Sequence, residues 1–491
     1  MGAGPRVAII GAGMSGLAMG IALRRAGMED FTIHEKAADI GGTWRENTYP
    51  GVACDVPAHL YSFSFEPNPD WSRVYAPGHE IQGYFKRVAA RYGLAPHVRL
   101  GSEVTGAHFD ERTAKWRLST AAGEQDEADV LVSAVGALHV PNLPDIAGLD
   151  SFAGEVMHSA RWNPDMDLAG KRVAVIGSAA SAVQIVPSIA GKVAHLDVFQ
   201  RTANWIIPRL DRAYPASWKR AFRKVPLTGR LHRWQLYWML ESRFPLFKRR
   251  GPRNDRERRL ALRHLEAQVP DPALRRKLTP DYPPGCKRIL VSDDFYPALT
   301  RGKVALVTEP IARVEPDAVV TADGTRHPAD VLILATGFRT TDIPKTAIVG
   351  RGGLALRDAW KNGLAAHRTV AVPGFPNFFT LLGPNSGLGH SSIIFMVEAQ
   401  VRYVMQCLWT LVERRTIEPR EDAAARFDAA MQRGLKDTIW HAGCHSWYQD
   451  PNGKITTLWP YGTVRYWWEM RRVKFAEYRL GPEKPAAVLS R

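Results

Sequence analysis

The chain has 491 residues, 45% of them hydrophobic, which is enough for two or three domains with substantial cores. No apolar run approaches the roughly 18 residues that a membrane-spanning helix needs, and the N-terminus leads directly into a strand pattern, so we expect neither a membrane span nor a signal peptide. The net charge of +16 suits an anionic partner: a phosphorylated cofactor, nucleic acid or an acidic membrane surface.

The four cysteines are scattered along the chain and include no C-x-x-C pair. We therefore predict neither a metal site nor a disulfide framework, and a reducing cytoplasm is the natural setting. The same absence argues against the disulfide reductases, which need adjacent redox cysteines. The four residues are Cys54, Cys286, Cys407 and Cys444.

The N-terminus is predicted to form a strand, a glycine turn and a helix. Residues 6–10 are a short apolar run typical of a buried parallel strand. Gly11 allows the tight turn, Gly13 lets the backbone approach a pyrophosphate, and Gly16 lets helix and strand pack closely. Glu35 lies nineteen residues after Gly16, where a carboxylate binds ribose hydroxyls. The residues expected to contact this first dinucleotide are Gly11, Gly13, Ser15, Gly16 and Glu35.

The same pattern recurs at residues 172–182, after a second apolar run. Gly177 begins the turn, but Ala179 and Ala182 replace two of the usual glycines and add methyl groups where the backbone approaches the pyrophosphate. This predicts either a looser second site or a displaced cofactor. The residues expected to contact the second dinucleotide are Gly177, Ser178, Ala179, Ser181, Ala182, Arg201 and Thr202.

The two turns differ in the residue that follows them at equal spacing. Glu35 lies twenty-four residues after Gly11, and Arg201 lies twenty-four residues after Gly177. An acid suits a ribose diol and a base suits a 2′-phosphate, so Arg201 favours NADPH over NADH at the second site. A surface arginine at a strand end is the alternative interpretation.

A second pair of matching segments closes each half of the chain. Residues 129–136 and 330–337 each run from an aspartate through an apolar strand to a glycine, so the chain contains a diverged internal repeat. We predict an α/β fold with two Rossmann-like dinucleotide-binding domains, one for FAD and one for NADP, and a helical insertion. The expected FAD domain comprises residues 1–145 and 340–491, the NADP domain residues 146–208 and 279–339, and the basic helical insert residues 209–278.

A fingerprint, F-x-G-x-x-x-H-x-x-x-W, lies between the two nucleotide motifs and comprises Phe152, Gly154, His158 and Trp162. Between two such motifs, this spacing resembles the signature of Baeyer-Villiger monooxygenases, in the flavin-containing monooxygenase superfamily. The chain has Asn163 where the family commonly has proline or aspartate. The alternative is that these are ordinary residues packing two domains together, and the resemblance itself places His158 at the joint and not in the chemistry.

The resemblance also assigns roles to residues outside the fingerprint. The Gly41-Gly42-Thr43-Trp44 motif is expected beside the flavin, and Asp55, after Tyr49-Pro50-Gly51, is expected in the active site. Taken alone, Asp55 is more often a turn or cap residue, and most Lys-Arg pairs such as Lys287-Arg288 lie on basic loops. The additional cofactor-binding residues that the resemblance implies are Gly42, Thr43, Trp44, Asp55, Tyr61, Val104 and Lys287.

The activity that the resemblance implies is insertion of one oxygen atom of O2 into a ketone, giving an ester or lactone through a flavin C4a-peroxide formed with FAD and NADPH. Arg288 would stabilise the negative charge of the oxygen intermediate, and Asp55 would orient Arg288. Two alternatives stay open: an S- or N-oxygenating flavin-containing monooxygenase, and a membrane-associated flavin-binding protein without oxygenase activity.

The insert is rich in arginine, lysine and aromatic residues. It fits a solvated basic face over an aromatic core, and it also fits a peripheral membrane contact, because basic residues interleaved with aromatics suit the lipid interface. Nucleic-acid binding is not expected, because no reader motif accompanies the charge. The sequence does not predict an oligomeric state.

Two late segments complete the prediction. Residues 373–384 are expected to form a strand, followed by a helix from Ser391 to about Arg414 whose N-terminus faces the flavin. The aromatic-rich stretch from Trp440 to Trp468 is expected to be mostly core and domain cover, with some residues lining a substrate pocket.

Overall fold

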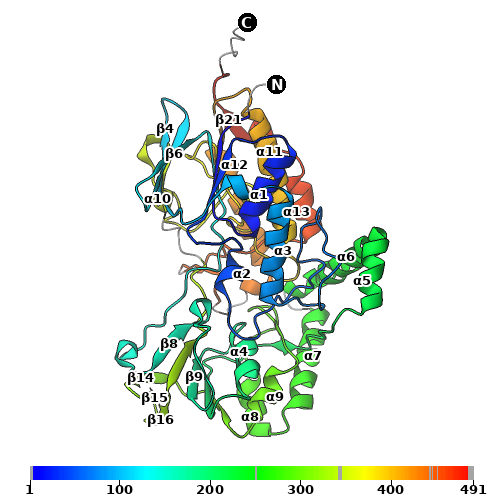
Figure 1. Ribbon diagram of the computed structural model, residues 1–491, viewed down its shortest axis with the longest axis vertical. Coiled ribbons are helices and arrows are strands. Elements are labelled where there is room, and N and C mark those ends of the chain that lie inside the picture. The colour runs from blue at the N-terminus through cyan, green and yellow to red at the C-terminus, as the bar shows by residue number, and fades with distance from the viewer. Residues whose placement is uncertain are drawn as a thin grey trace.

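Two parallel sheets, each covered by helices, form the framework of the computed structural model (Figure 1). The apolar runs predicted as strands are fully buried in both sheets, as parallel strands covered on both faces must be. No helix in the described part of the chain is long and apolar enough to cross a membrane. The structure describes residues 4–248, 251–340, 346–441, 444, 446–450 and 452–484.

The first sheet has the strand order β19-β7-β1-β2-β3. Its largest core cluster joins it to several helices, four of which lie together in Figure 1. These are α1 (Met14–Arg25), α3 (Gly78–Arg91), α11 (Ile393–Thr410) and α13 (Thr463–Met470). The strands are β1 (Val7–Ile10), β2 (Phe31–His34), β3 (Val98–Arg99), β7 (Val130–Ser133) and β19 (Phe378–Thr380).

A smaller sheet with the order β18-β4-β5-β6 covers the other face of the first sheet. Trp116, which is fully buried, joins the two sheets by donating its Nε1–H to the carbonyl of Pro376 at 2.9 Å. The strands are β4 (Val104–Asp110), β5 (Lys115–Thr120), β6 (Gln125–Ala128) and β18 (Ala347–Val349).

The second large sheet has the order β13-β10-β9-β17-β8. Helices α4 (Ala182–Ile189) and α9 (Phe295–Leu299) pack on one face, and the small antiparallel sheet β14-β15-β16 joins the core on the other. The strands are β8 (Glu155–His158), β9 (Arg172–Ile176), β10 (His195–Phe199), β13 (Val304–Val307), β14 (Ile311–Glu315), β15 (Ala318–Thr321), β16 (Arg326–Pro328) and β17 (Val331–Leu334).

The internal repeat is visible in the hydrogen bonds of the two sheets. Asp129 accepts the backbone N–H of Arg6 at 2.8 Å, and Asp330 accepts the backbone N–H of Arg172 at the same distance. Each aspartate therefore holds the start of its central strand against the next strand of the sheet. The expected fold class of two Rossmann-like domains with a helical insertion is confirmed, and the predicted boundaries at residues 145, 208, 278 and 339 fall between the groups of strands and stay a prediction.

The insert divides between the two cores. Its first half, α5 (Ala216–Lys224) and α6 (Pro226–Glu241), contributes to the core of the first sheet. Its second half, α7 (Pro252–Gln268) and α8 (Pro272–Leu278), contributes to the core of the second sheet. The short parallel pair β11 (Ile206–Ile207) and β12 (Leu290–Val291) brackets the insert, so both of its ends are tied to one place.

Two predicted element bounds are wrong in detail. The strand expected over 373–384 is only β19, because Asn377 has a left-handed backbone (φ 56°) that interrupts the extended chain. The helix expected from Ser391 begins at Ile393, since Ser392 caps it by accepting the N–H of Ile394, and it ends at Thr410. The remaining helices near the C-terminus are α10 (Leu356–Ala359) and α12 (Glu421–Lys436), and β20 (Ile417–Pro419) pairs with β21 (Tyr478–Leu480).

Candidate active site between two dinucleotide folds

The first glycine turn has the backbone shape that a pyrophosphate requires. Gly11 has φ +105°, and a Cβ there would lie 2.7 Å from the carbonyl oxygen of Ala134. A Cβ on Gly16 would collide with the carbonyl oxygen of Gly11, so helix α1 can pack this closely only with glycine. No side chain caps α1 and no acid lies in its first turn, which leaves its positive end available to phosphates.

Glu35 is buried at the end of β2, beside this turn. Its carboxylate accepts N–H groups from Ala12 at 2.8 Å and Ala37 at 3.0 Å. Each oxygen keeps a further lone pair, so the carboxylate is fixed in position and can still accept a ribose hydroxyl. Gly11, Gly13, Ser15, Gly16 and Glu35 therefore lie together and fit the adenosine diphosphate part of FAD.

The G-G-T-W motif crosses the same turn. Gly42 packs against Gly13 so closely that a Cβ would lie 2.9 Å from the Gly13 Cα. Thr43 begins the short helix α2 (Thr43–Glu46), and the Trp44 indole N–H donates to the Tyr61 hydroxyl at 3.1 Å. These predicted residues thus gather beside the first turn. Val104 is buried at the start of β4, and its carbonyl accepts the hydroxyl of Thr346 at 3.0 Å.

The second turn repeats the first with one difference. Gly177 has φ +110°, and a Cβ there would lie 2.5 Å from the carbonyl oxygen of Ala335. Helix α4 begins at Ala182, five residues after Gly177, whereas α1 begins at Met14, three residues after Gly11. The methyl group of Ala182 explains the longer turn, since a Cβ at the matching Gly16 would collide with the turn. A looser second turn is therefore what the geometry shows. Asn204, which was not predicted from the sequence, donates to the carbonyl of Ser178 at 3.1 Å. The Ser178 hydroxyl donates to the carbonyl of Thr202 at 3.4 Å, so the turn is bound to the segment that follows β10.

Two cations lie close together beyond β10. Arg201 is exposed after the strand, and Lys287 places its ammonium 4.7 Å from the Tyr282 ring centroid. Burial lowers the pKa of Lys287, and the charge of Arg201 lowers it further. A pair of neighbouring cations at this place fits the 2′-phosphate of NADP.

Arg288 and Asp55 form an ion pair across 233 residues of sequence. Arg288 donates its Nε–H to Asp55 Oδ2 at 2.8 Å, and its Nη2 donates to the same oxygen. The side chains are 36% and 31% exposed, so the pair faces a space and is not sealed in a core. The negative charge of Asp55 raises the pKa of Arg288, which fixes this guanidinium as a cation.

Tyr448 borders this pair and was not singled out from the sequence. It is buried, and burial raises its pKa to about 12, opposed by the charge of Arg288. The residue comes from the C-terminal aromatic stretch, in which Trp440, Trp459 and Tyr466 are buried while Trp468 is 59% exposed. Only proximity in the fold reveals it, because no spacing relates it to Arg288.

The predicted absence of a disulfide is wrong. Cys286 and Cys444 form a disulfide, with Cα atoms 6.3 Å apart, two residues before Arg288 and four before Tyr448. The prediction failed because it used spacing along the chain, whereas the two loops meet only in the folded protein. Cys54 and Cys407 are buried and unpaired, and burial raises the pKa of both thiols. The described residues contain no cluster that could hold a metal ion.

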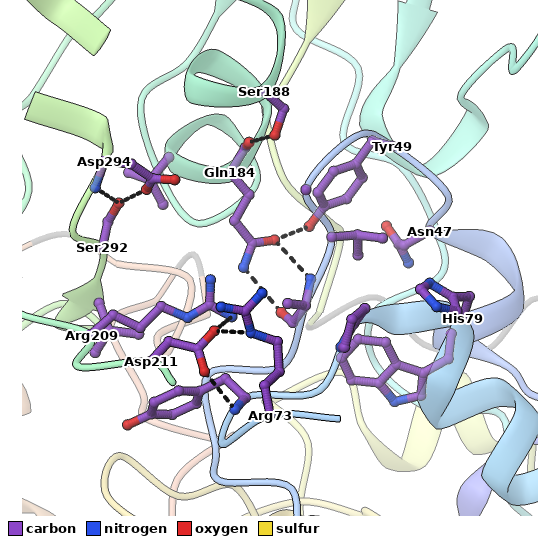
Figure 2. A pocket seen from close by; sticks show the side chains of 18 of the residues that line it. Asn47, Tyr49, Arg73, His79, Gln184, Ser188, Arg209, Asp211, Ser292 and Asp294 are labelled. Carbon is purple, nitrogen blue, oxygen red and sulfur yellow. Dashed lines mark hydrogen bonds and ion pairs between the residues drawn. The ribbon is translucent and has the colours of Figure 1, made fainter. Parts of the chain in front are cut away.

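A pocket of about 450 Å³ lies beside these elements, between the loop that leads to Asp55 and helix α4 (Figure 2). In Figure 2 the Tyr49 hydroxyl points at Gln184 and donates to its Oε1 at 3.1 Å. Gln184 in turn donates to the carbonyl of Ala53 at 3.0 Å. A Cβ on Gly51 would lie 2.6 Å from the Gln184 carbonyl oxygen, so the glycine of the Y-P-G motif permits this contact. The loop that carries Asp55 is therefore attached to the second dinucleotide fold.

The fingerprint forms the edge of the second sheet. A Cβ on Gly154 would collide with the carbonyl of Asp330, so glycine is required beside β17. His158 ends β8, is buried, and accepts the N–H of Ala160 at 3.1 Å. Trp162 packs against the core of the second sheet. The structure thus places the fingerprint in the second sheet and its cores, and its role at the domain joint stays a prediction.

Residues 4–250 match the model of a family described as flavin-binding monooxygenase-like. A protein of Streptomyces coelicolor named Baeyer-Villiger monooxygenase is 46% identical over 488 residues, which cover 98% of this chain and 94% of that protein. The chain belongs to the Baeyer-Villiger monooxygenases.

Solved structures agree with this membership. The crystal structure of cyclohexanone monooxygenase from Rhodococcus sp. Phi1 bound to NADP+ is 29% identical, with a TM-score of 0.88 over 97% of this chain and 99% of that one. A structure titled OTEMO complex with FAD and NADP is 26% identical, with the same TM-score and coverage. The chain is thus a flavin- and NADPH-dependent monooxygenase, as predicted, while the roles of its individual residues stay predictions.

Proposed function

We propose that this monooxygenase inserts one oxygen atom of O2 into a ketone and releases an ester or lactone. The observation that carries the proposal is the Arg288–Asp55 ion pair, partly exposed and located between two dinucleotide folds. The cyclohexanone monooxygenase among the similar structures is named for a ketone, which supports a ketone as the substrate class.

FAD reduced by NADPH supplies the oxygen donor together with O2 when both cofactors are bound. Arg288 stabilises the negative charge that develops on oxygen as the ketone carbonyl is attacked. A guanidinium about 4 Å from a negative charge, at an effective dielectric constant of about 20, stabilises it by about 4 kcal/mol. Asp55 offsets part of this effect.

Asp55 acts as a positioning residue. It binds the Nε and Nη2 groups of Arg288, and the guanidinium has five N–H donors, so the others are free to face the substrate oxygen. Holding the fork in one orientation avoids reorganisation when charge develops. Arg201 and Lys287 bind the 2′-phosphate of NADPH. The hydrogen bond between Tyr49 and Gln184 holds the FAD site and the NADPH site in a fixed position relative to each other.

The variant Arg288→Ala tests the proposal. We expect NADPH-dependent loss of flavin absorbance to continue, because the dinucleotide contacts are elsewhere, while ester formation from cyclohexanone falls by about 100-fold or more. Product is measured by gas chromatography, and hydrogen peroxide release is measured in parallel. Arg288→Lys keeps the positive charge but not the forked guanidinium, so its rate of ester formation should lie between those of the wild type and Arg288→Ala. Wild-type ester formation by Arg288→Ala contradicts the proposal, and product from sulfides or amines alone favours the heteroatom-oxygenating alternative.

We further propose that the basic insert makes a peripheral membrane contact and that the protein works in the cytoplasm. The Cys286–Cys444 disulfide removes the cysteine pattern as support for a reducing compartment. The contact is supported by the excess of arginine and lysine in residues 209–278 and by the exposed tryptophans of α5 and α6.

A further inference from the structure

Helix α6 presents a stripe of four large apolar side chains to solvent. The stripe comprises Leu227, Leu231, Trp234 and Trp238, which are 59%, 58%, 65% and 45% exposed. Their spacing of four, three and four residues places them on one face of the helix. The two indole rings meet edge to face with centroids 5.8 Å apart, so the stripe includes a continuous aromatic surface. An exposed apolar surface of this kind marks an interaction site.

The opposite face of α6 holds the helix firmly on the first domain. Leu236 and Leu240 are buried there. Arg233 donates to the carbonyl of Ser62 at 3.0 Å and to that of His59 at 2.5 Å, and the Tyr237 hydroxyl lies 2.9 Å from that of Thr463. The stripe is therefore held outward by a rigid contact, and α5 and α6 project from the side of the molecule (Figure 1).

The charge around the stripe has one sign. Residues 212–240 contain seven arginines and lysines, of which Arg233 faces the first domain, and no aspartate or glutamate. Glu241 ends α6, but its carboxylate is largely buried and binds His390 and Thr463. Arg230 lies on α6 beside the stripe, and the exposed Arg220, Arg223 and Lys224 lie on the adjoining α5. Arg223 pairs with Asp70 of the first domain, so Arg220, Lys224 and Arg230 are the exposed cations of the two helices that are available to a partner.

We infer that the α5–α6 hairpin docks on an anionic phospholipid bilayer, with the α6 stripe in the interface and the neighbouring cations against the headgroups. This rests on the membrane contact proposed for the insert and is independent of ketone oxidation. Tryptophan prefers the boundary between headgroups and acyl chains, and basic residues beside it bind anionic lipid. A second copy fits less well, because a symmetric pairing through this stripe brings the same cations together with no exposed acid on the hairpin to pair them.

The test is co-sedimentation of the FAD-loaded, full-length protein with vesicles, without substrate. We expect binding to vesicles of phosphatidylglycerol and phosphatidylcholine, weakening at high salt, and much less binding to phosphatidylcholine alone. The double variant Trp234→Ser, Trp238→Ser should bind at least about ten-fold more weakly. Trp409→Ser removes an exposed tryptophan of α11 that is 51% exposed and should bind as wild type. Flavin absorbance and melting temperature confirm that both variants fold.

Three outcomes overturn the inference. Wild-type protein that stays in the supernatant with anionic vesicles excludes lipid docking. Equal binding by the double variant places the membrane contact elsewhere. A concentration-dependent dimer in light scattering that the double variant loses assigns the stripe to a second copy. Because ketone turnover is measured separately and without vesicles, failure of the catalytic proposal leaves these results unchanged.

Discussion

Arg201 and Lys287 lie close enough that the positive charge of one lowers the pKa of the other. Two neighbouring positive charges repel each other, and a dianionic phosphate that binds between them stabilises both. This arrangement is the basis, at the residue scale, for the proposed binding of the 2′-phosphate by Arg201 and Lys287.

We predict that Arg201→Gln raises the KM for NADPH by about ten- to a hundredfold, since hydrogen bonds to charged groups contribute about 1.5–3 kcal/mol. The KM for NADH should change little, because it has no 2′-phosphate. Steady-state kinetics with both cofactors measures this, and Arg259→Gln, an exposed arginine of α7, is the control. An equal rise for both cofactors would assign Arg201 a structural role.

The glycine turns also belong to the residue scale. Gly11 and Gly177 face matching carbonyls of Ala134 and Ala335, so neither position accepts a side chain. Gly16 and Ala182 occupy matching positions, but α1 begins two residues before Gly16 whereas α4 begins at Ala182 itself. A single methyl group thus accounts for the different shapes of the two turns.

At the scale of elements, the insert joins the two domains from outside. The contact of α5 and α6 with the first domain centres on His59, a buried ring that packs against Tyr214, Phe222 and His232. Burial, together with the nearby His232 and Arg233, lowers the pKa of His59 to about 3. Its Nε2 has no hydrogen-bond partner among the described residues.

This histidine predicts an acid-sensitive contact. Below about pH 6.5 the unfolded chain binds a proton at His59, while the folded protein does not until the pH approaches 3. Protonation of His59 therefore does not reduce the free energy of unfolding above pH 6.5, and it reduces that free energy progressively as the pH falls from 6.5 toward 3. At pH 5 the loss is about 2 kcal/mol. His59→Phe keeps the ring and should flatten the fall of melting temperature between pH 7 and 5. His108→Phe, at an exposed position of β4, should behave as wild type. A slope in His59→Phe equal to that of wild type would contradict the assignment.

At the scale of the whole molecule, the disulfide joins the loop of Arg288 to the C-terminal segment of Tyr448. The loop that it closes, with a sequence separation of 158, includes most of the second half of the first domain. A cross-link over so long a loop restricts the unfolded chain strongly.

We predict that the double variant Cys286→Ser, Cys444→Ser is about 2–5 kcal/mol less stable than the wild type. Differential scanning calorimetry with and without reductant checks this. Reductant should lower the melting temperature of the wild type toward that of the variant and leave the variant unchanged. A wild-type melting temperature that does not respond to reductant would show that the two thiols are unlinked in solution.

The sequence by itself determined the parts of this protein that depend on local interactions. Both glycine turns, the strands beside them and the acid or base that follows each turn are specified within about thirty residues. Backbone sterics set the turns, and short continuous runs of apolar residues set the strands. The pairing of Asp55 with Arg288 was also expected, through motifs that resemble a family, although 233 residues separate them.

Only the tertiary structure decided which distant loops meet. The Cys286–Cys444 disulfide, the place of Tyr448 beside Arg288 and the bond from Tyr49 to Gln184 each join segments whose sequences carry no sign of one another. The direction of the α6 stripe was equally hidden, because its aromatic residues suit a core as well as a surface. Burial and contact are properties of the whole packed chain, so they become known only when every element has its position.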